Sequence, residues 1–329
     1  MIPPYPERSR ERDHWILARR PARLESASSP SPELRPAGFL AEEEPAESGG
    51  VISVATIFLT NRECPWRCLM CDLWRHTLTR TVPSGAIPAQ IDYALERMSP
   101  ARQIKLYNSG SFFDHRAIPP DDYPAIAARL QQFERVIVES HPALVNDDCA
   151  RFRDLLAGRL EVAMGLETVH PEVLPRLNKR LTLDQFSRAA ARLCAEGVAL
   201  RTFILVKPPF LDESAALEWA ARSLDFAFDC GAGVAALIPT RFGNGALEAL
   251  AERGEFAPPR LETLEAAMAY GLELGRGRVL ADLWDLERPA GPVCLACRPA
   301  RVARLGAMNL QQTVLPSILC ESCESDPGD

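Results

Sequence analysis

The chain has 329 residues, of which 47% are hydrophobic and 25% are charged. It can therefore bury a large core, and disorder throughout is excluded. The formal net charge of −7 and a pI near 5.5 argue against a strongly basic nucleic-acid surface, although not against a local basic patch. No apolar run approaches the roughly twenty residues of a membrane span, and the N-terminus has no apolar signal core. We expect a cytoplasmic protein with no membrane partner.

Residues 1–49 are rich in Pro, Ser, Arg and Glu and show no hydrophobic period. This composition predicts a flexible or wrapping N-terminal extension, with a short helix within residues 10–24 that is interrupted at Pro21. We assign no function to it.

From Val51 onward, short apolar runs alternate with stretches of helical periodicity. Such alternation predicts right-handed βαβ units on a parallel sheet. The six expected strands, fewer than a full eight-fold barrel requires, cover residues 51–59, 104–107, 135–139, 160–165, 200–206 and 234–238. Periodicity alone does not separate an open barrel from a doubly wound sheet. We expect a core over residues 50–245 and a C-terminal extension over residues 246–329, with a helix at 261–274 and a strand at 278–284.

Three cysteines, Cys64, Cys68 and Cys71, follow the first expected strand with the spacing C-x3-C-x2-C. Three thiolates from one loop can hold three irons of a [4Fe–4S] cluster and leave the fourth iron open. An open metal position binds and activates a small molecule, whereas a structural site is closed. Three unrelated buried cysteines are the alternative. The charged residues around them make that alternative unfavourable: Arg62, Glu63, Arg67 and Asp72. Seven of the ten cysteines lie in close groups, which fits metal ligation in a reducing compartment.

This loop resembles the signature of the radical S-adenosylmethionine (SAM) superfamily. In that family the open iron binds the amino and carboxylate groups of SAM. Reductive cleavage then gives methionine and a 5′-deoxyadenosyl radical that abstracts a substrate hydrogen. The resemblance implies that Cys64, Cys68 and Cys71 are cluster ligands, that the fold is a partial (β/α)6 TIM-like barrel, and that an electron donor such as flavodoxin or ferredoxin is a partner. Met70 stands where the family usually has an aromatic residue near the adenine, and its flexible thioether can fill that space.

Polar residues at the carboxyl ends of the expected strands are the candidates for SAM binding, because chemistry gathers there in such folds. Asn108, Ser109, Gly110 and Ser111 are similar to the glycine-rich segment that holds the SAM amino group in the family, although they also fit an ordinary turn. The resemblance makes Glu167 a polar SAM contact, the alternative being a salt-bridge partner. Three more residues fit either substrate or SAM binding or a structural role: His141, Lys207 and Arg241.

Taken together, the cluster loop, residues 108–113 and residues 165–168 resemble one branch of the superfamily. This branch contains the elongator catalytic subunit, oxygen-independent coproporphyrinogen oxidase and the methylthiotransferases. Within it the chain is most similar to the radical SAM subunits of archaeosine synthases, which are tRNA-modifying lyases. The substrate is then a tRNA or nucleoside, or else a small metabolite. The excess of acidic over basic residues argues against a tRNA substrate. A local basic patch could still come from Arg75, His76, Arg80, Lys179, Arg180 and Arg241.

Two further pairs, Cys294-x2-Cys297 and Cys320-x2-Cys323, predict a four-cysteine metal site in the C-terminal extension. Four thiolates suit either zinc or an iron–sulfur cluster. We favour a second [4Fe–4S] cluster over zinc, because the protein already depends on cluster delivery. The residues Arg298, Arg301 and Arg304 could hold an anionic substrate or form a solvated helix face. The lone Cys149, Cys194 and Cys230 fit core packing.

Two other functions fit the same cysteines. One is a sulfur-insertion or methylthiotransferase-type radical SAM enzyme that consumes the C-terminal cluster as its sulfur source. The other is a non-catalytic module in which both cysteine sets bind zinc and the protein binds nucleic acid or a partner. Iron content separates the second function from the radical enzyme.

Overall fold

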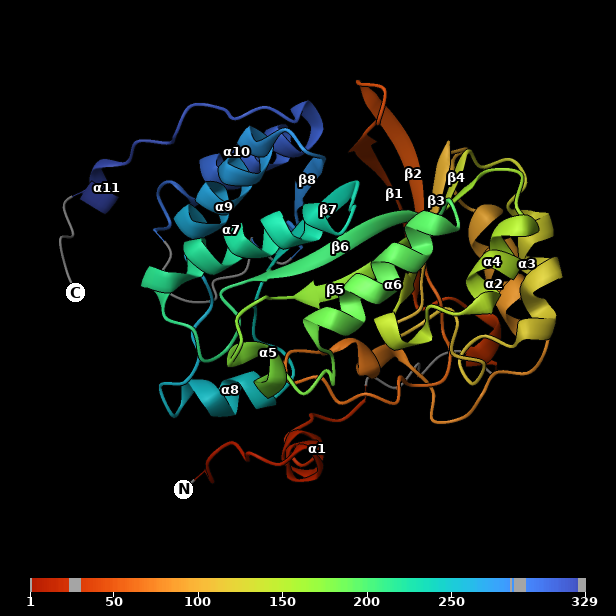
Figure 1. Cartoon of the computed structure of the whole chain (residues 1–329), viewed down its shortest axis with the longest axis horizontal. Coiled ribbons are helices and arrows are strands. Elements are labelled where there is room, and N and C mark those ends of the chain that lie inside the picture. The colour runs from red at the N-terminus through yellow and green to blue at the C-terminus, as the bar shows by residue number, and fades with distance from the viewer. Residues whose placement is uncertain (1, 24–30, 285, 287–293, 325–329) are drawn as a thin grey trace.

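The computed structural model describes residues 2–23, 31–284, 286 and 294–324. An eight-stranded sheet with the strand order β1 to β8 organises this part of the chain (Figure 1). Its strands are β1 (Gly38–Pro45), β2 (Val51–Phe58), β3 (Gln103–Tyr107), β4 (Arg135–Ser140), β5 (Arg159–Glu167), β6 (Ala199–Val206), β7 (Val234–Pro239) and β8 (Arg278–Ala281). The six predicted parallel strands are β2 to β7, so the α/β half-barrel is confirmed.

Helices precede, alternate with and follow the strands, and most of them cover the outer face of the sheet. They are α1 (Ser9–Leu17), α2 (Ala86–Leu95), α3 (Tyr123–Arg129), α4 (Asp147–Asp154), α5 (Val173–Arg176), α6 (Leu183–Ala195), α7 (Glu213–Asp229), α8 (Ala246–Ala251), α9 (Leu261–Leu274), α10 (Arg298–Gln311) and α11 (Glu321–Glu324). Short 3-10 turns are η1 (Pro32–Leu34), η2 (Leu73–His76), η3 (Pro120–Asp122) and η4 (Pro142–Leu144). Alternate strand residues such as Val162 and Met164 join the core beneath the helices. Their neighbours in sequence therefore face the barrel interior.

Strand β1 was not predicted, because its Ala41-Glu42-Glu43-Glu44 run has low β propensity and resembles an acidic linker. It pairs antiparallel with β2. The tight turn between the two strands has Gly49 and Gly50 at φ 88° and 80°, values that favour glycine. The carboxylates of Glu42 and Glu44 bind Lys105, an ion pair between distant segments that no local sequence pattern reveals.

A buried ion network shows that the sheet curls on itself. Arg201 on β6 donates hydrogen bonds to Glu44 on β1, both 2.8 Å, and to Glu161 on β5, 2.6 Å. Because β1 and β6 are separated by four strands in the sheet order, this contact crosses the barrel interior. Arg135 extends the network to Glu161 at 2.7 Å. The network fills the end of the barrel opposite to the carboxyl ends of the parallel strands.

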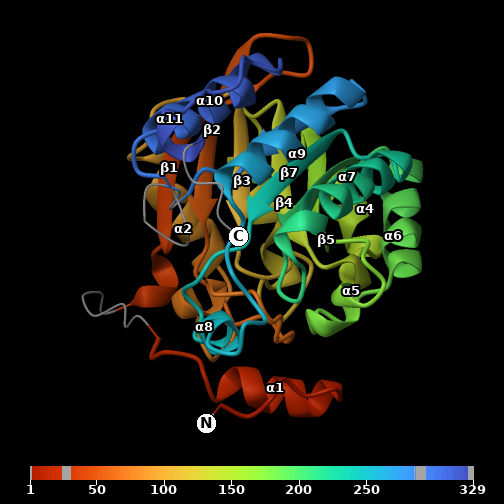
Figure 2. The ribbon, with the colours of Figure 1, turned by 90° about the vertical axis from the view of Figure 1, so that its left-hand side faces the viewer.

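Helix α10 spans the gap between the first and last strands, since it contacts both β1 and β8. The side-chain amide of Asn309 binds the backbone N–H and C=O of Ala281, and Gln312 does the same at Val279, with distances of 2.7–2.9 Å. These side-chain amides form hydrogen bonds with backbone groups that β8, as an edge strand, would otherwise leave unpaired. Figure 2 shows α10 in front of β1, which it contacts.

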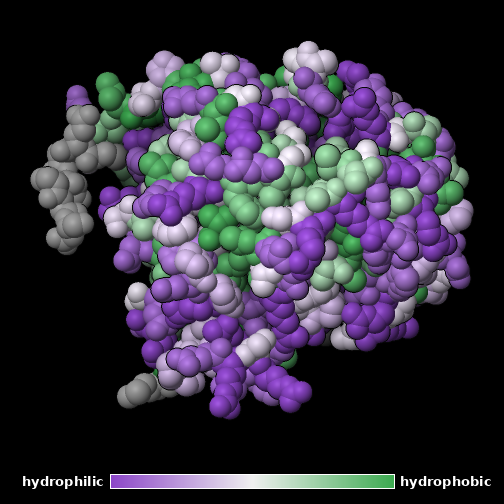
Figure 3. Space-filling view, viewed as in Figure 1, coloured by the Kyte–Doolittle hydropathy of each residue, from purple (hydrophilic) through white to green (hydrophobic). Residues whose placement is uncertain are grey.

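The N-terminal segment wraps one end of the molecule, where α1 lies near α8 in both ribbon views (Figures 1 and 2). Tyr5, Trp15 and Ile16 pack with Leu69 of the cysteine loop and with Leu247 of α8 in a second core. Hydrophilic residues cover most of the face seen in Figure 3, and hydrophobic ones gather near its centre. None of the helices described here has both the length and the apolar character needed to cross a membrane.

Candidate active site

The loop that carries Cys64, Cys68 and Cys71 leaves the carboxyl end of β2 and returns through η2. Its base is closed by two backbone hydrogen bonds, from Leu78 N–H to Asn61 and from Glu63 N–H to Leu78, both 2.8 Å. All three cysteines are free and partly buried. The loop therefore has a fixed base and presents its thiols at the strand ends, as the sequence predicts.

Two buried asparagines hold the loop from the other side. The Asn178 amide donates to the carbonyl of Arg67 at 2.8 Å, and the Asn244 amide donates to the carbonyl of Leu69 at 2.7 Å. The N–H of Leu69 in turn donates to Leu177 at 2.9 Å. No local sequence pattern singles out these asparagines, and Asn178 has φ 56°, a left-handed conformation that Asn tolerates better than most residues.

Glu63 ties the N-terminal segment to the loop. Its carboxylate binds Arg20 at 2.6 Å, Arg67 at 3.1 Å, and Arg23. Burial alone would raise the pKa of Glu63, but these guanidinium groups hold it below its usual range. The N-terminal extension is thus part of the scaffold of the site.

The three loop thiols fit an iron–sulfur cluster better than one metal ion. Burial raises the pKa of Cys64, Cys68 and Cys71 to about 12, so it takes a bound metal to displace their protons. The sulfurs of these three cysteines do not all lie within 4.8 Å of one another. Among the described residues, only Cys294, Cys297 and Cys320 form a group that compact. Three irons of a cubane, each with its own thiolate, need this wider spacing.

The segment after β3 lies against the loop. A Cβ added to Gly110 would lie 3.3 Å from the Cβ of Cys64. Within the described structure, both polar atoms of the fully buried Asn108 amide lack a hydrogen-bond partner. Ser109 has φ 54°, and Ser111 accepts a hydrogen bond from the His141 N–H at 2.7 Å. An orphaned buried amide beside a cluster ligand fits a bound polar molecule, and SAM offers both donors and acceptors.

Glu139 shapes this segment and was missed from the sequence. One of its carboxylate oxygens accepts hydrogen bonds from the backbone N–H of Asn108 at 2.6 Å and of Gly110 at 3.3 Å. Burial raises the pKa of Glu139 to about 7, against the opposing effect of these N–H groups and of Lys179. The only sequence signal for this role of Glu139 is its position at a strand end next to a predicted turn.

Glu167 is an ion-pair partner of Lys179, and both side chains are buried. Glu167 has φ 68° at an irregularity in the β5–β6 pairing. A Cβ on Gly165 would lie 2.1 Å from Lys179 Nζ and 2.2 Å from Glu167 Oε1, so only glycine leaves room for the pair. Lys179 interacts electrostatically with Cys68 and Cys64 as well as with Glu167. The buried Lys179 is therefore not part of a surface patch, which corrects that expectation.

His141 lies beneath the loop, and its ring is stacked on Trp66. Its Nε2–H donates to the carbonyl of Lys179 at 3.1 Å, and its Nδ1 accepts from the N–H of Ala143 at 3.1 Å. Burial, reinforced by the Lys179 charge, lowers the pKa of His141 to about 3. The ring is therefore neutral and holds the loop in place.

The remaining candidates lie in different surroundings. Met70 is partly buried and packs against both of the smaller hydrophobic cores. The Lys207 ammonium binds Glu213 at 2.9 Å and the carbonyl of Pro258 at 3.4 Å, so its role toward SAM stays a prediction. Arg241 is ion-paired with Asp282 and donates a hydrogen bond to the carbonyl of Trp284.

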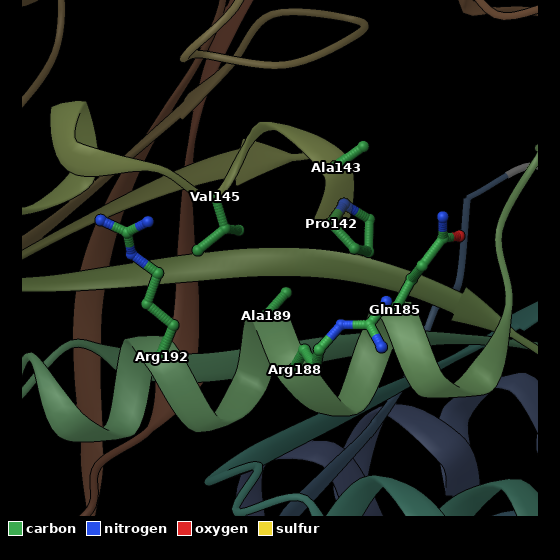
Figure 4. Close-up of a pocket in the computed structure, with 7 residues that line it drawn as sticks. All are labelled: Pro142, Ala143, Val145, Gln185, Arg188, Ala189 and Arg192. Carbon is green, nitrogen blue, oxygen red and sulfur yellow. The ribbon is translucent and has the colours of Figure 1, made fainter.

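A groove between η4 and α6 adjoins His141, because its lining residue Ala143 donates a backbone hydrogen bond to the His141 ring (Figure 4). Its lining includes Pro142, Gln185, Arg188 and Arg192. Arg188 is paired with Asp184, and Arg192 with Asp147 and Glu196. The groove brings no cysteine or strand-end residue together, and we assign it no chemistry.

The C-terminal cysteines form a second group. The ligand atoms of Cys294, Cys297 and Cys320 all lie within 4.8 Å of one another, whereas the Cys323 side chain lies outside the described residues. The solvated helix face expected for the nearby arginines is wrong, because Arg298, Arg301 and Arg304 are all buried. Arg301 and Arg304 share Glu265 of α9 as an ion-pair partner.

Comparisons with known proteins agree with this geometry. Residues 58–220 match the sequence profile of the radical SAM superfamily. The chain is 28% identical to archaeosine synthase subunit beta of Methanosarcina acetivorans, over 74% of this chain and 75% of that protein. It is 28% identical to the subunit of the same name from Thermococcus kodakarensis, over 68% and 72%. An uncharacterized protein of Methanocaldococcus jannaschii is 25% identical, and the match spans 61% of its length.

The fold is also similar to that of Elp3 from the archaeon Methanocaldococcus infernus. The TM-score is 0.50 at 14% identity, over 68% of this chain and 59% of that one. This likeness concerns the fold alone. The profile match and the named relatives identify an enzyme, which excludes the non-catalytic zinc module. Residues 58–220 of this chain are a radical SAM domain.

Proposed function

We propose that this enzyme reductively cleaves SAM at a [4Fe–4S] cluster held by Cys64, Cys68 and Cys71, and that it modifies a nucleoside in tRNA. The observation that carries the first part is the orphaned, fully buried amide of Asn108 next to Cys64. The resemblance to archaeosine synthase beta subunits supports the second part.

The chain's own residues bind, orient and shield. When bound, the cluster supplies the electron that cleaves the sulfonium of SAM. Asn108 is placed to hydrogen-bond polar groups of SAM, and Glu139 fixes the backbone of that segment. Lys179 and Glu167 form a buried ion pair at the same strand ends. The Lys179 ammonium suits the carboxylate of SAM, and the Glu167 carboxylate suits its hydroxyl or amino groups. The interior network around Arg201 closes the opposite end to water.

The charge distribution supports a nucleic-acid substrate despite the acidic total. Residues 1–23, 59–80 and 170–180 hold twelve arginines and six carboxylates, whereas the whole chain has 37 basic and 44 acidic residues. Contacts join these segments: Arg12 donates to the carbonyl of Pro175 at 2.6 Å, and Arg20 binds Glu63. Arginines at the mouth of the site suit the phosphates of tRNA. Exposed ones are Arg8, Arg10, Arg80 and Arg180.

The first test is SAM cleavage by anaerobically reconstituted protein. Dithionite, or a reduced flavodoxin or ferredoxin, supplies the electron, and 5′-deoxyadenosine is measured by mass spectrometry. Asn108→Ala should retain iron but bind SAM about tenfold or more weakly, because the amide contacts are lost. Asn146→Ala, which removes a helix-capping contact of α4, is the matched control and should bind SAM normally. No 5′-deoxyadenosine from the iron-loaded wild type would refute the proposed reaction.

The second test concerns the substrate. Unmodified tRNA should bind with strong salt dependence, and an Arg10→Glu/Arg180→Glu variant should bind it more weakly while cleaving SAM at the wild-type rate. Deuterium carried by the tRNA should appear in the isolated 5′-deoxyadenosine, which would report that the hydrogen is abstracted from the tRNA. Cleavage of SAM without tRNA binding would keep the radical chemistry and overturn the tRNA substrate.

A further inference from the structure

The C-terminal cysteines form a more compact group than the cluster-loop cysteines, whose sulfurs do not all lie within 4.8 Å of one another. The Sγ atoms of Cys294 and Cys320 are 3.7 Å apart, and all three sulfurs lie within 4.8 Å. A Zn–S bond of about 2.3 Å implies about 3.8 Å between two thiolates of a tetrahedron. Thiolates of a cubane cluster bind different irons and stand farther apart. The geometry therefore suits one ion shared by three sulfurs.

We infer that Cys294, Cys297 and Cys320 bind a single zinc ion, and that this ion fastens the C-terminal tail to the start of α10. Cys294 and Cys297 form one turn: the Arg298 N–H donates to the carbonyl of Cys294 at 3.2 Å, and the Arg301 N–H donates to that of Cys297 at 3.0 Å. Cys320 arrives from the other end of the helix, after residues 312–319 have run back along it. Zinc binding displaces the thiol protons and cross-links the two segments.

A buried arginine supports the thiolates. Arg301 Nε donates a hydrogen bond to Cys297 Sγ at 3.2 Å, and the same guanidinium is ion-paired with the buried Glu265. Donors of this kind orient metal-bound ligands and stabilise their negative charge. Arg301 and Arg304 also donate to carbonyls of the returning tail, at Ile318, and at Leu315 and Pro316. The site is thus built into the packing of α9, α10 and the tail.

The location gives the ion a structural role. Helix α10 is the element that spans the gap between β1 and β8. Zinc at its first turn fixes the element that closes the side of the barrel, and it leaves no second cluster to serve as a sulfur source. The inference is independent of the substrate proposed above, and the metal is measured separately from SAM cleavage.

The experiment measures zinc and iron in anaerobically purified full-length protein. Wild type should contain about one zinc together with the iron of one cluster. The Cys64→Ser/Cys68→Ser/Cys71→Ser variant should lose the iron and keep the zinc. Cys294→Ser should lose the zinc and keep the iron, while Cys194→Ser, at an exposed lone cysteine, should keep both.

A cobalt-substituted protein provides a measurement that does not depend on the folding of a cysteine variant. Cobalt in place of zinc in the wild type should give the absorption of a tetrahedral thiolate site. Iron that remains in the loop variant, or a wild type that holds only iron, would overturn the inference. A Cys294–Cys320 disulfide in protein purified under reductant, without zinc, would overturn it as well. If the zinc is confirmed and no 5′-deoxyadenosine forms, the metal assignment stands and the proposed reaction fails.

Discussion

The ring of Trp66 in the cluster loop stacks on the ring of His141 after β4, with centroids 3.9 Å apart and an interplanar angle of 11°. His141 is also bound to the backbone at Lys179 and Ala143, so the stack fixes the loop to the strand ends. The positions of the cysteines depend on contacts of this kind as much as on the cysteine spacing.

Replacing Trp66 should therefore loosen the loop without removing a ligand. Trp66→Ala should lower the iron retained after desalting, and lower the free energy of unfolding by about 1–3 kcal/mol, because the stacked area is lost. Trp66→Phe keeps an aromatic face and should retain most of the iron. Iron analysis and thermal unfolding provide the comparison, and equal iron in the alanine variant and the wild type would contradict it.

Asn178 is the second support of the loop. Asn178→Ala removes the hydrogen bond to Arg67 and places alanine at φ 56°, so it should cost about 1–3 kcal/mol of stability and reduce cluster incorporation. Asn178→Gly relieves the backbone strain but not the lost hydrogen bond. If cluster incorporation depends on the hydrogen bond, both variants should incorporate less iron than wild type. Full iron incorporation in the glycine variant would show that only the backbone conformation matters.

Gly165 offers a test of the strand-end ion pair. In Gly165→Ala the new Cβ would collide with Lys179 Nζ and Glu167 Oε1, so the pair must move. SAM affinity, measured by equilibrium binding to the reconstituted protein, should fall about tenfold or more. Gly233→Ala is the matched control, because nothing lies within 4 Å of its added Cβ. Unchanged SAM affinity in Gly165→Ala would exclude the pair from SAM binding.

The interior network predicts a loss of stability in acid. Burial alone would raise the pKa of Glu44 and of Glu161, but Arg201 holds both below the usual range. A carboxyl whose pKa is lower in the folded state adds stability above its unfolded pKa, about 4.3, and loses it as the pH falls toward the folded value. The melting temperature should therefore fall steeply as the pH drops below about 5.

Glu44→Gln isolates this effect. The variant leaves Arg201 less well compensated, should cost about 3–5 kcal/mol at pH 7, and should show a flatter melting profile in acid. Glu134→Gln, in the exposed pair with Arg102, should change little. A steep acid profile retained in Glu44→Gln would assign the acid sensitivity to other carboxyls.

The sequence predicts the six parallel strands and the cysteine loop, because short apolar runs indicate the strands and the cysteine spacing indicates the loop. Strand β1 is not predicted, since the buried Glu44 and the half-buried Glu42 find their partners, Lys105 and Arg201, on distant strands. The roles of Glu139, Asn178 and Asn244 could not be predicted for the same reason, because their hydrogen-bond partners are backbone groups of other loops. The arginines of α10 are a similar case: their helical spacing suggests a solvated face, but Arg301 and Arg304 are buried and ion-paired with Glu265 of α9.

The most direct measurement of the central claim is electron paramagnetic resonance of the reduced, reconstituted protein before and after addition of SAM. Wild type should give the signal of a [4Fe–4S]⁺ cluster, and SAM should change that signal because it binds the open iron. The Cys64→Ser/Cys68→Ser/Cys71→Ser variant should give no such signal. A wild-type cluster whose signal is unchanged by saturating SAM, with no 5′-deoxyadenosine formed, would contradict the account.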